Sequence, residues 1–324
     1  MVNPIISYII TPQTYPQQSN MRHATPVFSI TPWPFLLTFL ATIASLGTAQ
    51  EQSNDLSMSK ALSFFAPFDG APTATLARGE KTLFISDSVN NRATAREWSP
   101  SQSHIQLSNQ EGRFSGCLRF ERASDQVVFY KAQNNFPIPA ENGSGTVSFW
   151  LKTDPDKELK EGFCDPIQIT SKQWDDASFF VEFEKRASGV PFRLGIYADK
   201  NIWNPTGIDF AAIPVEKRPL ASVDRPPFRR DQWIHVAFTF SNFNSSLPNA
   251  TSTLYLNGAR VGSISPRIQT FTWDAKHAAI MLGLNYIGCI DELAIFQREL
   301  KDHEIQTLYG LPNGVSDLID KEIK

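Results

Sequence analysis

The clearest pattern in this sequence is a series of short runs in which apolar and polar positions alternate. It is strongest at residues 231–264, where a run that is largely apolar on both faces, residues 233–240, is followed by a polar loop and a second run, residues 253–256. Asn257-Gly258 then predicts a hairpin turn, because both residues tolerate positive φ. A strand with two apolar faces belongs inside a sandwich of sheets, so this stretch predicts the core of such a fold.

Similar runs recur from residue 61 onward, with turn-rich segments between them. The other expected strands are residues 61–68, 82–86, 112–121, 126–130, 145–153, 178–184, 191–198, 279–284 and 287–296. Helical spacing is visible only at residues 302–309. The long irregular stretch at residues 199–230 is more typical of a functional or capping loop than of a connector. The pattern predicts an all-β, two-sheet antiparallel sandwich with a short C-terminal helix.

The first 49 residues differ from the rest of the chain. Residues 35–49 contain an apolar core followed by Gly47-Thr48-Ala49, the arrangement of a secretory signal peptide. The apolar core is interrupted by threonines and is shorter than the roughly 20 residues that span a bilayer, which favours a signal over a membrane anchor. We therefore expect the protein to be secreted or extracytoplasmic, at the cell surface or in the periplasm, with no membrane insertion after signal removal. The expected organisation is a leader at 1–49, a linker at 50–60, one domain at 61–312 and a C-terminal tail at 313–324.

Composition excludes several classes of protein. With 19% charged residues, 41% hydrophobic residues and a net charge of -3, the chain lacks the signature of disorder and the basic excess of a nucleic-acid-binding protein. Its cysteines, Cys117, Cys164 and Cys289, are odd in number and cannot form a complete disulfide framework. Their spacing does not match a zinc or haem site.

Four segments match one family pattern in order and spacing. They are FAPFDG (65–70), GRFSGCLRF (112–120), the pair WIHVA and LYLNG (233–237 and 254–258), and GCIDELAIFQRELKDHEIQTLY (288–309). In these segments the chain resembles the LamG-like (laminin G-like) jelly-roll domains of the concanavalin A-like lectin/glucanase superfamily. The resemblance implies two antiparallel sheets that face each other in a jelly roll, secretion, and recognition of carbohydrate or protein. One departure is Lys301 before the final helix, where the family has Ser or Thr, so Asp302 is expected to become the N-cap.

Asp69 and Asp291 match positions where relatives with this fold often bind a structural calcium ion. The two carboxylates come from the first and the penultimate strands and would repel each other unless a hard cation lay between them. The alternative is that Asp69 caps a turn while Asp291 pairs with a surface cation. A structural calcium is therefore a possible cofactor of this chain.

Glu182 and Glu184 are the candidates for glycosidase chemistry, because they lie two apart on an expected strand and project to one face. Glycosidases of the superfamily that this chain resembles add a third carboxylate on the same strand, whereas Lys185 and Arg186 follow here. The pair is more typical of a solvated face beside basic residues, so we favour a non-catalytic protein. A lone histidine on a strand, His235, is more often a core residue than a base.

Trp174, Trp203 and Trp273 lie in expected loops, and flat aromatic faces suit the apolar side of a sugar ring. These tryptophans are the candidate ligand-binding residues, with covering of the sandwich edges as the alternative role. The long loop also has a basic excess that would attract a sulfated or uronic polysaccharide, although a solvated loop explains it equally well. Its basic residues are Lys217, Arg218, Arg225, Arg229 and Arg230.

The sequence thus favours a secreted, non-catalytic carbohydrate-binding or adhesion module of LamG-like fold. Its expected partner is a polysaccharide or glycoconjugate, or an extracellular protein. Two alternatives stay open: a glycan-active hydrolase or lyase of the same fold, glycoside hydrolase-like in its chemistry, and an extracellular protein-interaction module without sugar affinity. A deep cleft at Glu182 and Glu184 favours the enzyme, and a flat concave face poor in aromatic residues favours the protein-interaction module.

Overall fold

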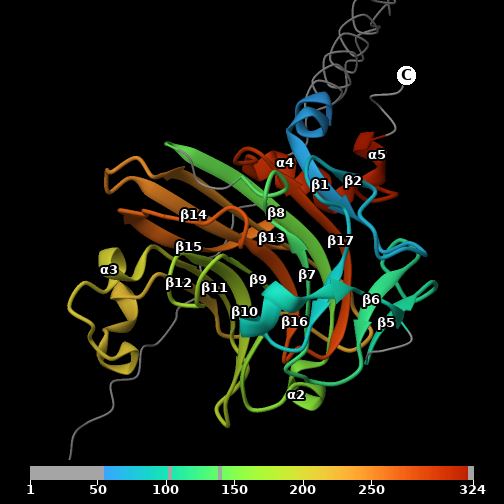
Figure 1. Ribbon diagram of the computed structural model, residues 1–324, viewed down its shortest axis with the longest axis horizontal. Helices are drawn as coiled ribbons and strands as arrows, with labels where there is room; N and C mark the ends of the chain where they lie inside the picture. The colour runs from blue at the N-terminus through green and yellow to red at the C-terminus, as the bar shows by residue number, and fades with distance from the viewer. Residues whose placement is uncertain (1–54, 101–103, 138–140, 320–324) are drawn as a thin grey trace, which may run out of the picture. The chain divides into compact units, whose positions relative to one another are not determined.

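The computed structural model describes residues 55–100, 104–137 and 141–319. Two antiparallel sheets face each other in these residues, with few helices and a short C-terminal helix (Figure 1), so the predicted sandwich is confirmed. No helix in these ranges is long and apolar enough to cross a membrane. The expected signal segment, residues 35–49, lies outside the described residues.

The first sheet has nine strands and contains the hairpin at Asn257-Gly258 that the sequence predicted. Its main path runs β15-β14-β13-β8-β17-β1-β2, and β6 joins β5 to the end of β17. The strands of this sheet are β1 (Leu62–Ala66), β2 (Leu76–Ala77), β5 (Ile105–Ser108), β6 (Cys117–Phe120), β8 (Gly143–Lys152), β13 (Ile234–Phe243), β14 (Ala250–Leu256), β15 (Ala259–Arg267) and β17 (Gly288–Phe296).

The second sheet has eight strands in the order β12-β11-β10-β9-β16-β7-β3-β4. Its strands are β3 (Phe84–Ser86), β4 (Arg96–Glu97), β7 (Val127–Lys131), β9 (Gly162–Thr170), β10 (Ser178–Lys185), β11 (Phe192–Tyr197), β12 (Leu220–Val223) and β16 (Ala279–Leu284). The sequence pattern missed β9 because Pro166 interrupts it, and proline is rare in a central strand. A register irregularity opposite Glu182 accommodates this proline between β10 and β16.

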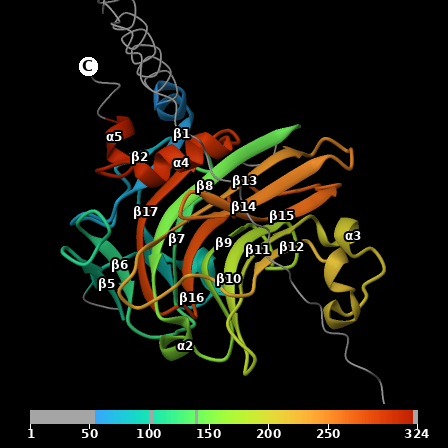
Figure 2. The same cartoon turned by 180° about the vertical axis from the view of Figure 1, so that it is seen from behind.

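The helices are short and lie in connections or at the chain ends. They are α2 (Pro155–Glu158), α3 (Lys200–Trp203), α4 (Asp302–Gly310) and α5 (Ser316–Ile319), with 3-10 turns η1 (Val89–Thr94), η3 (Phe210–Ala212) and η4 (Val215–Lys217). The long stretch at 199–230 therefore contains α3, η3, η4 and the edge strand β12. Figure 1 and Figure 2 show α4 and α5 beside β1 and β17, and α3 on the opposite flank near β12 and β15.

Phenylalanine side chains fill much of the space between the sheets. Phe179 of β10 has its ring centroid 4.8 Å from those of Phe240 and Phe271, and 5.2 Å and 5.5 Å from those of Phe136 and Phe243. All five rings are buried. Such aromatic contacts add to the free energy gained by removing large apolar surfaces from water, so this cluster anchors the two sheets to each other.

A second, smaller core lies on the outer face of the nine-stranded sheet, under α4 and α5. Ile305 of α4 and Leu318 of α5 are fully buried there, together with Met58 of the helical residues 55–61. In their described parts, the segments expected as a linker and a tail are therefore packed against the domain.

The N-cap expected at Asp302 is wrong. Lys301 is the N-cap of α4 and Asp302 is its first helical residue. The backbone N–H of Lys301 donates to Glu304 Oε2 at 2.8 Å. This contact ties the carboxylate at the third helical position to the chain entering the helix, so the first turn is stabilised without Ser or Thr at the cap.

A bulge in β17 creates the most unusual backbone feature of the nine-stranded sheet. Glu292 has φ 56°, a left-handed conformation that is uncommon outside glycine, and the pairing with β8 shifts register between Asp291 and Ala294. Before the bulge β17 pairs with β6, and after it with β1. The bulge therefore places two neighbouring acidic side chains at a junction of three strands.

Candidate functional site

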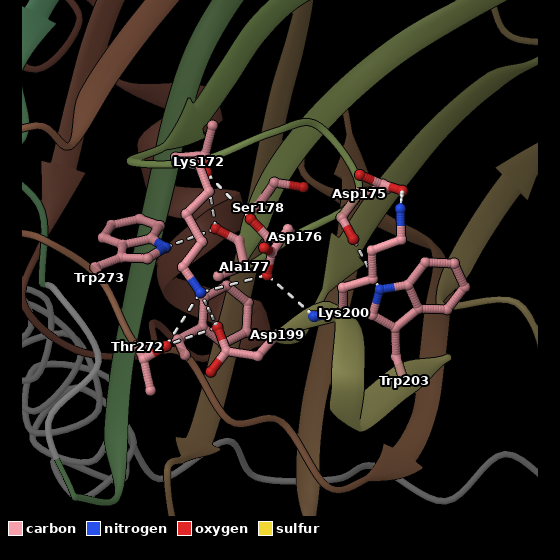
Figure 3. Close-up of polar contacts among 12 residues, drawn as sticks. Lys172, Asp175, Asp176, Ala177, Ser178, Asp199, Lys200, Trp203, Thr272 and Trp273 are labelled. Atoms are coloured by element: carbon pink, nitrogen blue, oxygen red, sulfur yellow. Dashed lines mark hydrogen bonds and ion pairs between the residues drawn. The ribbon is translucent and has the colours of Figure 1, made fainter. Parts of the chain in front are cut away.

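Three chain segments that carry the sequence-predicted tryptophans meet around the loop between β9 and β10 (Figure 3). Trp174 belongs to this loop. The indole N–H of Trp203, in α3, donates to the Asp175 carbonyl at 2.8 Å, and that of Trp273, before β16, donates to the Ala177 carbonyl at 2.6 Å. The structure thus brings together residues that are about 100 positions apart in the chain. We call this group of segments the loop cluster.

An ionic network around Lys172 fixes the loop cluster. Lys172 Nζ lies 2.6 Å from Asp199 Oδ1, 3.3 Å from Asp176 Oδ1 and 3.1 Å from Thr272 Oγ1. Burial disfavours the charged form of Lys172, but its hydrogen bond to Asp199 and the attraction of both carboxylates outweigh burial and raise its pKa. Lys200 adds an ion pair to Asp175 at 2.7 Å. Charge-assisted contacts from several segments make this end of the sandwich well ordered.

Trp174 is the exposed member of an aromatic group. Its side chain is 46% exposed, and its ring lies 5.8 Å from Tyr197 and 6.0 Å from Phe210, both in edge geometry. Behind it, Tyr197 contacts Trp203 with 4.8 Å between centroids. We call Trp174, Tyr197, Trp203 and Phe210 the aromatic platform. An exposed indole held by one buried and two partly buried rings is suited to binding the apolar face of a ring-shaped ligand.

Trp203 and Trp273 are partly buried and pack against the main core. The ring of Trp273 lies 5.5 Å from Phe136 and 5.8 Å from Phe179. Both indole N–H groups donate to the β9–β10 loop. These two tryptophans therefore hold the loop cluster in place, and Trp174 offers the free surface.

The basic residues of the 199–230 stretch do not form one patch. The Arg218 guanidinium lies 4.5 Å above the Phe210 ring, at the aromatic platform. Arg230 pairs with Glu158 at 3.3 Å, next to α2. Arg225 and Arg229 line a separate cavity beside Asp224. Only Arg218 thus contacts the aromatic platform.

Glu182 and Glu184 share a face, as the alternation predicted, but both are bound by one arginine. Phe179, Val181 and Phe183 point into the core, so the two glutamates lie on the outer face of the eight-stranded sheet. Arg193, directly across from Glu182 on β11, donates to both carboxylates. Its Nε lies 2.9 Å from Glu182 Oε1, and the Glu182–Arg193 pair is almost fully buried.

Both carboxylates of this pair are in ion pairs. Burial raises the pKa of Glu182, and the attraction of Arg193 opposes that rise. Arg186 forms a further ion pair with Glu184. Asp165, on β9 beside the irregularity, also has a raised pKa, because burial and the nearby Glu182 charge both disfavour its ionised form. Arg193 was missed from the sequence although the β10–β11 hairpin places it opposite Glu182.

Asp69 and Asp291 lie at the two sides of the 112–116 turn. The Gly116 N–H donates to Asp69 Oδ1 at 2.6 Å, and the Arg113 N–H donates to Asp291 Oδ2 at 2.6 Å. Gly116 is so close to the end of β1 that a Cβ would approach the Phe68 carbonyl oxygen to 2.3 Å. Glycine is therefore required there, and it brings the two aspartates to one place.

Glu292, which the sequence reasoning did not single out, joins this acidic group through the bulge. Burial raises the pKa of Asp291 to about 7, and the charge of Asp69 adds to the rise while hydrogen bonds from backbone N–H groups oppose it. Burial likewise raises the pKa of Glu292 to about 9. Within the described residues, Asp291 Oδ1 and Glu292 Oε1 are buried without a hydrogen-bond partner. We call Asp69, Asp291 and Glu292 the acidic triad.

The acidic triad offers oxygen ligands of the kind that a hard cation prefers, but its carboxylate oxygens are not gathered within 4.8 Å of one another, as the ligand atoms of Glu111, Cys117 and Cys289 are. Calcium prefers carboxylate and carbonyl oxygens, and two buried carboxylate oxygens here lack any partner in the described chain. No lysine or arginine of the described residues forms an ion pair with any of the three carboxylates. A buried anion without a counter-charge is unfavourable, so a bound cation would remove an unfavourable contribution to folding.

His235 and the cysteines occupy the interior. His235 Nε2 lies 2.9 Å from Ser148 Oγ, and complete burial lowers its pKa to about 3, so the ring is neutral. The three cysteines are buried and unbridged. The sulfur atoms of Cys117 and Cys289 lie within 4.8 Å of each other and of a Glu111 carboxylate oxygen, but Arg119 pairs with that carboxylate at 2.7 Å.

Solved structures with the same fold have low sequence identity to this chain. One is domain 4 of AbnA, a GH43 extracellular arabinanase from Geobacillus stearothermophilus, in complex with arabinotriose, with 15% identity, a TM-score of 0.46, and coverage of 76% of this chain and 97% of that chain. The botulinum neurotoxin serotype C1 binding domain has 12% identity, a TM-score of 0.51, and coverage of 78% and 52%. The binding domain of botulinum neurotoxin DC in complex with SialylT has 12% identity, a TM-score of 0.48, and the same coverage.

The described chain thus spans about half the length of the toxin binding domains. At such identities the similarity concerns the fold alone. No curated protein sequence matches the chain. A sequence profile of the concanavalin A-like lectin/glucanases superfamily matches residues 123–306, from just before β7 into α4, which is more than half of the chain. The chain therefore belongs to the concanavalin A-like lectin/glucanase superfamily.

Proposed function

We propose that this protein is a secreted, non-catalytic module that binds a polysaccharide or glycoconjugate at the aromatic platform. The observation that carries the proposal is Trp174, a 46% exposed indole supported by three further aromatic rings. Exposed, rigidly held aromatic rings bind sugars because the C–H groups of a pyranose or furanose cover the ring face. The ionic network at Lys172 supports the same conclusion, since it orders the loop that carries Trp174 before any ligand arrives.

The charges around Glu182 and Glu184 support the non-catalytic form of the proposal. Glycoside hydrolysis needs one ionised and one protonated carboxyl group on either side of the scissile bond. Here both glutamates accept hydrogen bonds from Arg193, and Glu184 also pairs with Arg186. A carboxylate tied to two guanidinium groups is kept in its ionised form, so it is a poor general acid.

The test is a glycan array with the purified full chain, followed by titration of the best glycan against Trp174→Ala. Phe163→Ala is the matched control, because Phe163 is a similarly exposed aromatic residue at the far end of β9. We expect Trp174→Ala to weaken binding about tenfold or more, by loss of one stacked ring, and Phe163→Ala to leave binding unchanged. If no glycan binds, or if both variants bind equally well, the proposal is wrong. Binding of an extracellular protein without glycan affinity would favour the adhesion alternative.

We also propose that the acidic triad holds a structural calcium ion. Asp69, Asp291 and Glu292 would supply the carboxylate oxygens, and calcium would provide the positive charge that the described neighbours do not. The ion would lock the end of β1 to the β17 bulge. It has no part in ligand binding under this proposal, because the aromatic platform belongs to other strands.

Secretion is part of the proposal and rests on the signal pattern of residues 35–49. Expression of the full chain in a secreting host should release protein into the medium. Sequencing of its first residues should give Gln50, the residue after Ala49. Retention of the protein in the cell with its leader intact would contradict secretion.

A further inference from the structure

A cavity of about 540 Å³ is lined by basic residues and by the β9–β10 loop, which also carries Trp174 of the aromatic platform. Its walls are η1 and the β9–β10 loop, and its floor is the outer face of β7 and β16. Its volume is within the range of about 300 to 1,000 Å³ that is typical of small-molecule sites. Ser171, Lys172 and Gln173 line the cavity, and Trp174 is the next residue of the same loop. We call it the basic cavity.

The charge of the basic cavity is strongly one-sided. Its lining contains Arg92, Lys131, Lys172, Lys276 and His277, and no described Asp or Glu contributes to it. This contrasts with the chain as a whole, which has a net charge of -3. A concave site lined by one sign of charge concentrates ligands of the opposite sign.

Three of these cations form no ion pair, although Lys131 and Lys276 lie close enough to Glu80 and Asp274 to help lower the pKa of those carboxyl groups. Lys172 is bound by Asp199, and His277 lies 2.7 Å from Asp274. In contrast, Arg92, Lys131 and Lys276 form no ion pair with any carboxylate in the described ranges. The unpaired cations are therefore available to a ligand.

Arg92 is the most constrained of the three. One of its terminal nitrogens donates to the Val89 carbonyl at 2.5 Å and contacts Met281 Sδ at 3.4 Å, which fixes the guanidinium over β16. Burial lowers the pKa of Arg92, as expected for a guanidinium without a counter-ion. An anion in the cavity would reverse this unfavourable effect.

The rest of the lining suits the body of a sugar. Phe84 and Phe129 stack with 5.8 Å between their centroids at the floor, and Lys131 lies 4.9 Å above the Phe84 ring. Ser171 Oγ is buried and has no hydrogen-bond partner among the described residues, so it is not an accessible group of the cavity wall. Apolar side chains and cations without an ion pair together match a ring that carries an anionic group.

We propose that the basic cavity binds the carboxylate or sulfate group of an acidic polysaccharide whose neighbouring sugar lies on Trp174. This proposal rests on the proposed function and names the class of glycan: one with anionic substituents. Arg92, Lys131 and Lys276 hold the anionic group, and the shared β9–β10 loop links the cavity to the aromatic platform.

The test compares three polymers with one backbone: dextran, carboxymethyl-dextran and dextran sulfate of matched length, at constant ionic strength. The carboxymethyl and sulfate arms distinguish the two anionic groups. The full chain should bind at least one charged polymer with a Kd at least about tenfold lower than that for dextran. The reason is that hydrogen bonds to charged groups contribute more free energy than hydrogen bonds between neutral groups. The double variant Lys131→Gln/Lys276→Gln should lose that gain, because both residues are exposed side chains that are not needed for folding.

The control is Lys160→Gln/Arg225→Gln, which also removes two exposed positive charges. Lys160 lies just before the first residue of β9, whereas the loop that lines the cavity follows the last residue of that strand. We expect this variant to retain the preference for the charged polymer. A third variant, Arg92→Gln, should lose the preference as well, and Arg92→Lys should restore part of it. Thermal unfolding of each variant shows whether it is folded.

The two proposals fail in different ways. If the charged polymers bind no tighter than dextran, or if the cavity and control variants lose affinity equally, the basic cavity does not select anionic glycans, and the role of Trp174 is untouched. Tighter binding of a single-stranded oligonucleotide than of either charged polymer also overturns the inference. If no glycan binds at all, the proposed function falls. Inorganic sulfate then tests the cavity by itself: equal thermal shifts for the cavity and control variants in sodium sulfate overturn it.

Discussion

Two groups of buried carboxylates in this sandwich have the same chemistry and opposite surroundings. On β10, Glu182 is buried against Arg193, whose guanidinium also reaches Glu184. On β17, Asp291 and Glu292 are equally buried but meet only backbone N–H groups. Burial raises carboxyl pKa values in both groups, yet only the first has a cation to oppose it.

This difference separates a structural ion pair from a site for a ligand. A paired cluster gains nothing from an added cation, whereas an unpaired one is stabilised by it. The two carboxylate groups should therefore respond in opposite ways to an added cation or to the loss of a charge. The expected changes in the free energy of unfolding fall from several kcal/mol to a few tenths of a kcal/mol.

Arg193→Met is expected to have the largest effect. It leaves Glu182 buried without its counter-charge and removes the shared partner of Glu184. Breaking a buried pair on one side typically lowers the free energy of unfolding by about 3 to 5 kcal/mol. Urea unfolding at pH 7 measures the loss. Arg225→Met, at an exposed arginine, should change stability little; an equal loss in both variants would mean that Arg193 acts through its bulk and not its charge.

Calcium should stabilise the protein by about 3 kcal/mol when free calcium is about 100 times its Kd. The stabilisation should be larger at pH 8 than at pH 5. At pH 5, Asp291 and Glu292 are protonated in the folded protein, because their pKa values are about 7 and about 9, and calcium must displace those protons. Thermal unfolding with calcium or with a chelator measures both effects. No shift at millimolar calcium at either pH rules out the calcium site.

The calcium-free protein should itself lose stability as the pH rises from about 7 to about 9. A carboxyl group whose pKa is higher in the folded than in the unfolded protein contributes fully below its unfolded pKa, and that contribution disappears as the pH rises through the folded pKa. The window for Asp291 thus runs from about 4 to about 7, and that for Glu292 from about 4 to about 9. Buried His235, with its pKa lowered to about 3, gives the opposite slope below about pH 6.5, so the test range is pH 7 to 9. Stability that stays flat or increases between pH 7 and 9 in chelator would contradict the raised pKa of Glu292.

Alternation and turn chemistry were enough to predict the sandwich and most of its strands. The hairpin at Asn257-Gly258 is an example, because φ is 50° and 77° at these two residues, as the turn requires. The sequence failed where tertiary contacts override local pattern. Pro166 hid β9, and the register irregularity that tolerates it depends on the neighbouring strand.

The site was harder to predict, because its parts meet only after folding. Asp69 and Asp291 came from family resemblance, but the role of Glu292 depends on a bulge that no single-strand pattern reveals. Trp174 and Trp273 lie in loops as expected, but Trp203 lies in the short helix α3. Only packing separates the exposed Trp174 from the two tryptophans that hold the loops. The basic cavity draws on η1, β7, β16 and the β9–β10 loop, so its charge was invisible in the linear sequence.

Removal of one carboxylate charge should change the free energy of unfolding in opposite directions in the two groups. In calcium-free buffer at pH 8, Glu292→Gln should stabilise the fold on the order of 2 kcal/mol, because the amide needs no proton and can still accept from the Val315 N–H. Glu182→Gln should destabilise it on the order of 1 to 2 kcal/mol, since Arg193 loses its buried partner. Urea unfolding of both variants gives the signs. The same sign for both would remove the distinction between the groups, and a retained calcium response in Glu292→Gln would exclude that residue as a ligand.

The smallest effect is expected at Arg186, the other arginine that binds Glu184. Its side chain is 51% exposed, compared with 8% for Arg193. Exposed ion pairs contribute about 0 to 1 kcal/mol, because water screens the charges and two long side chains must be ordered. Arg186→Gln should therefore change the free energy of unfolding by less than about 1 kcal/mol, and the change should vanish in about 1 M salt, where the screening length is near 3 Å. A loss as large as that of Arg193→Met would show that burial does not set the strength of these pairs. In that case the acidic triad, too, would have to be explained by something other than its missing counter-charge.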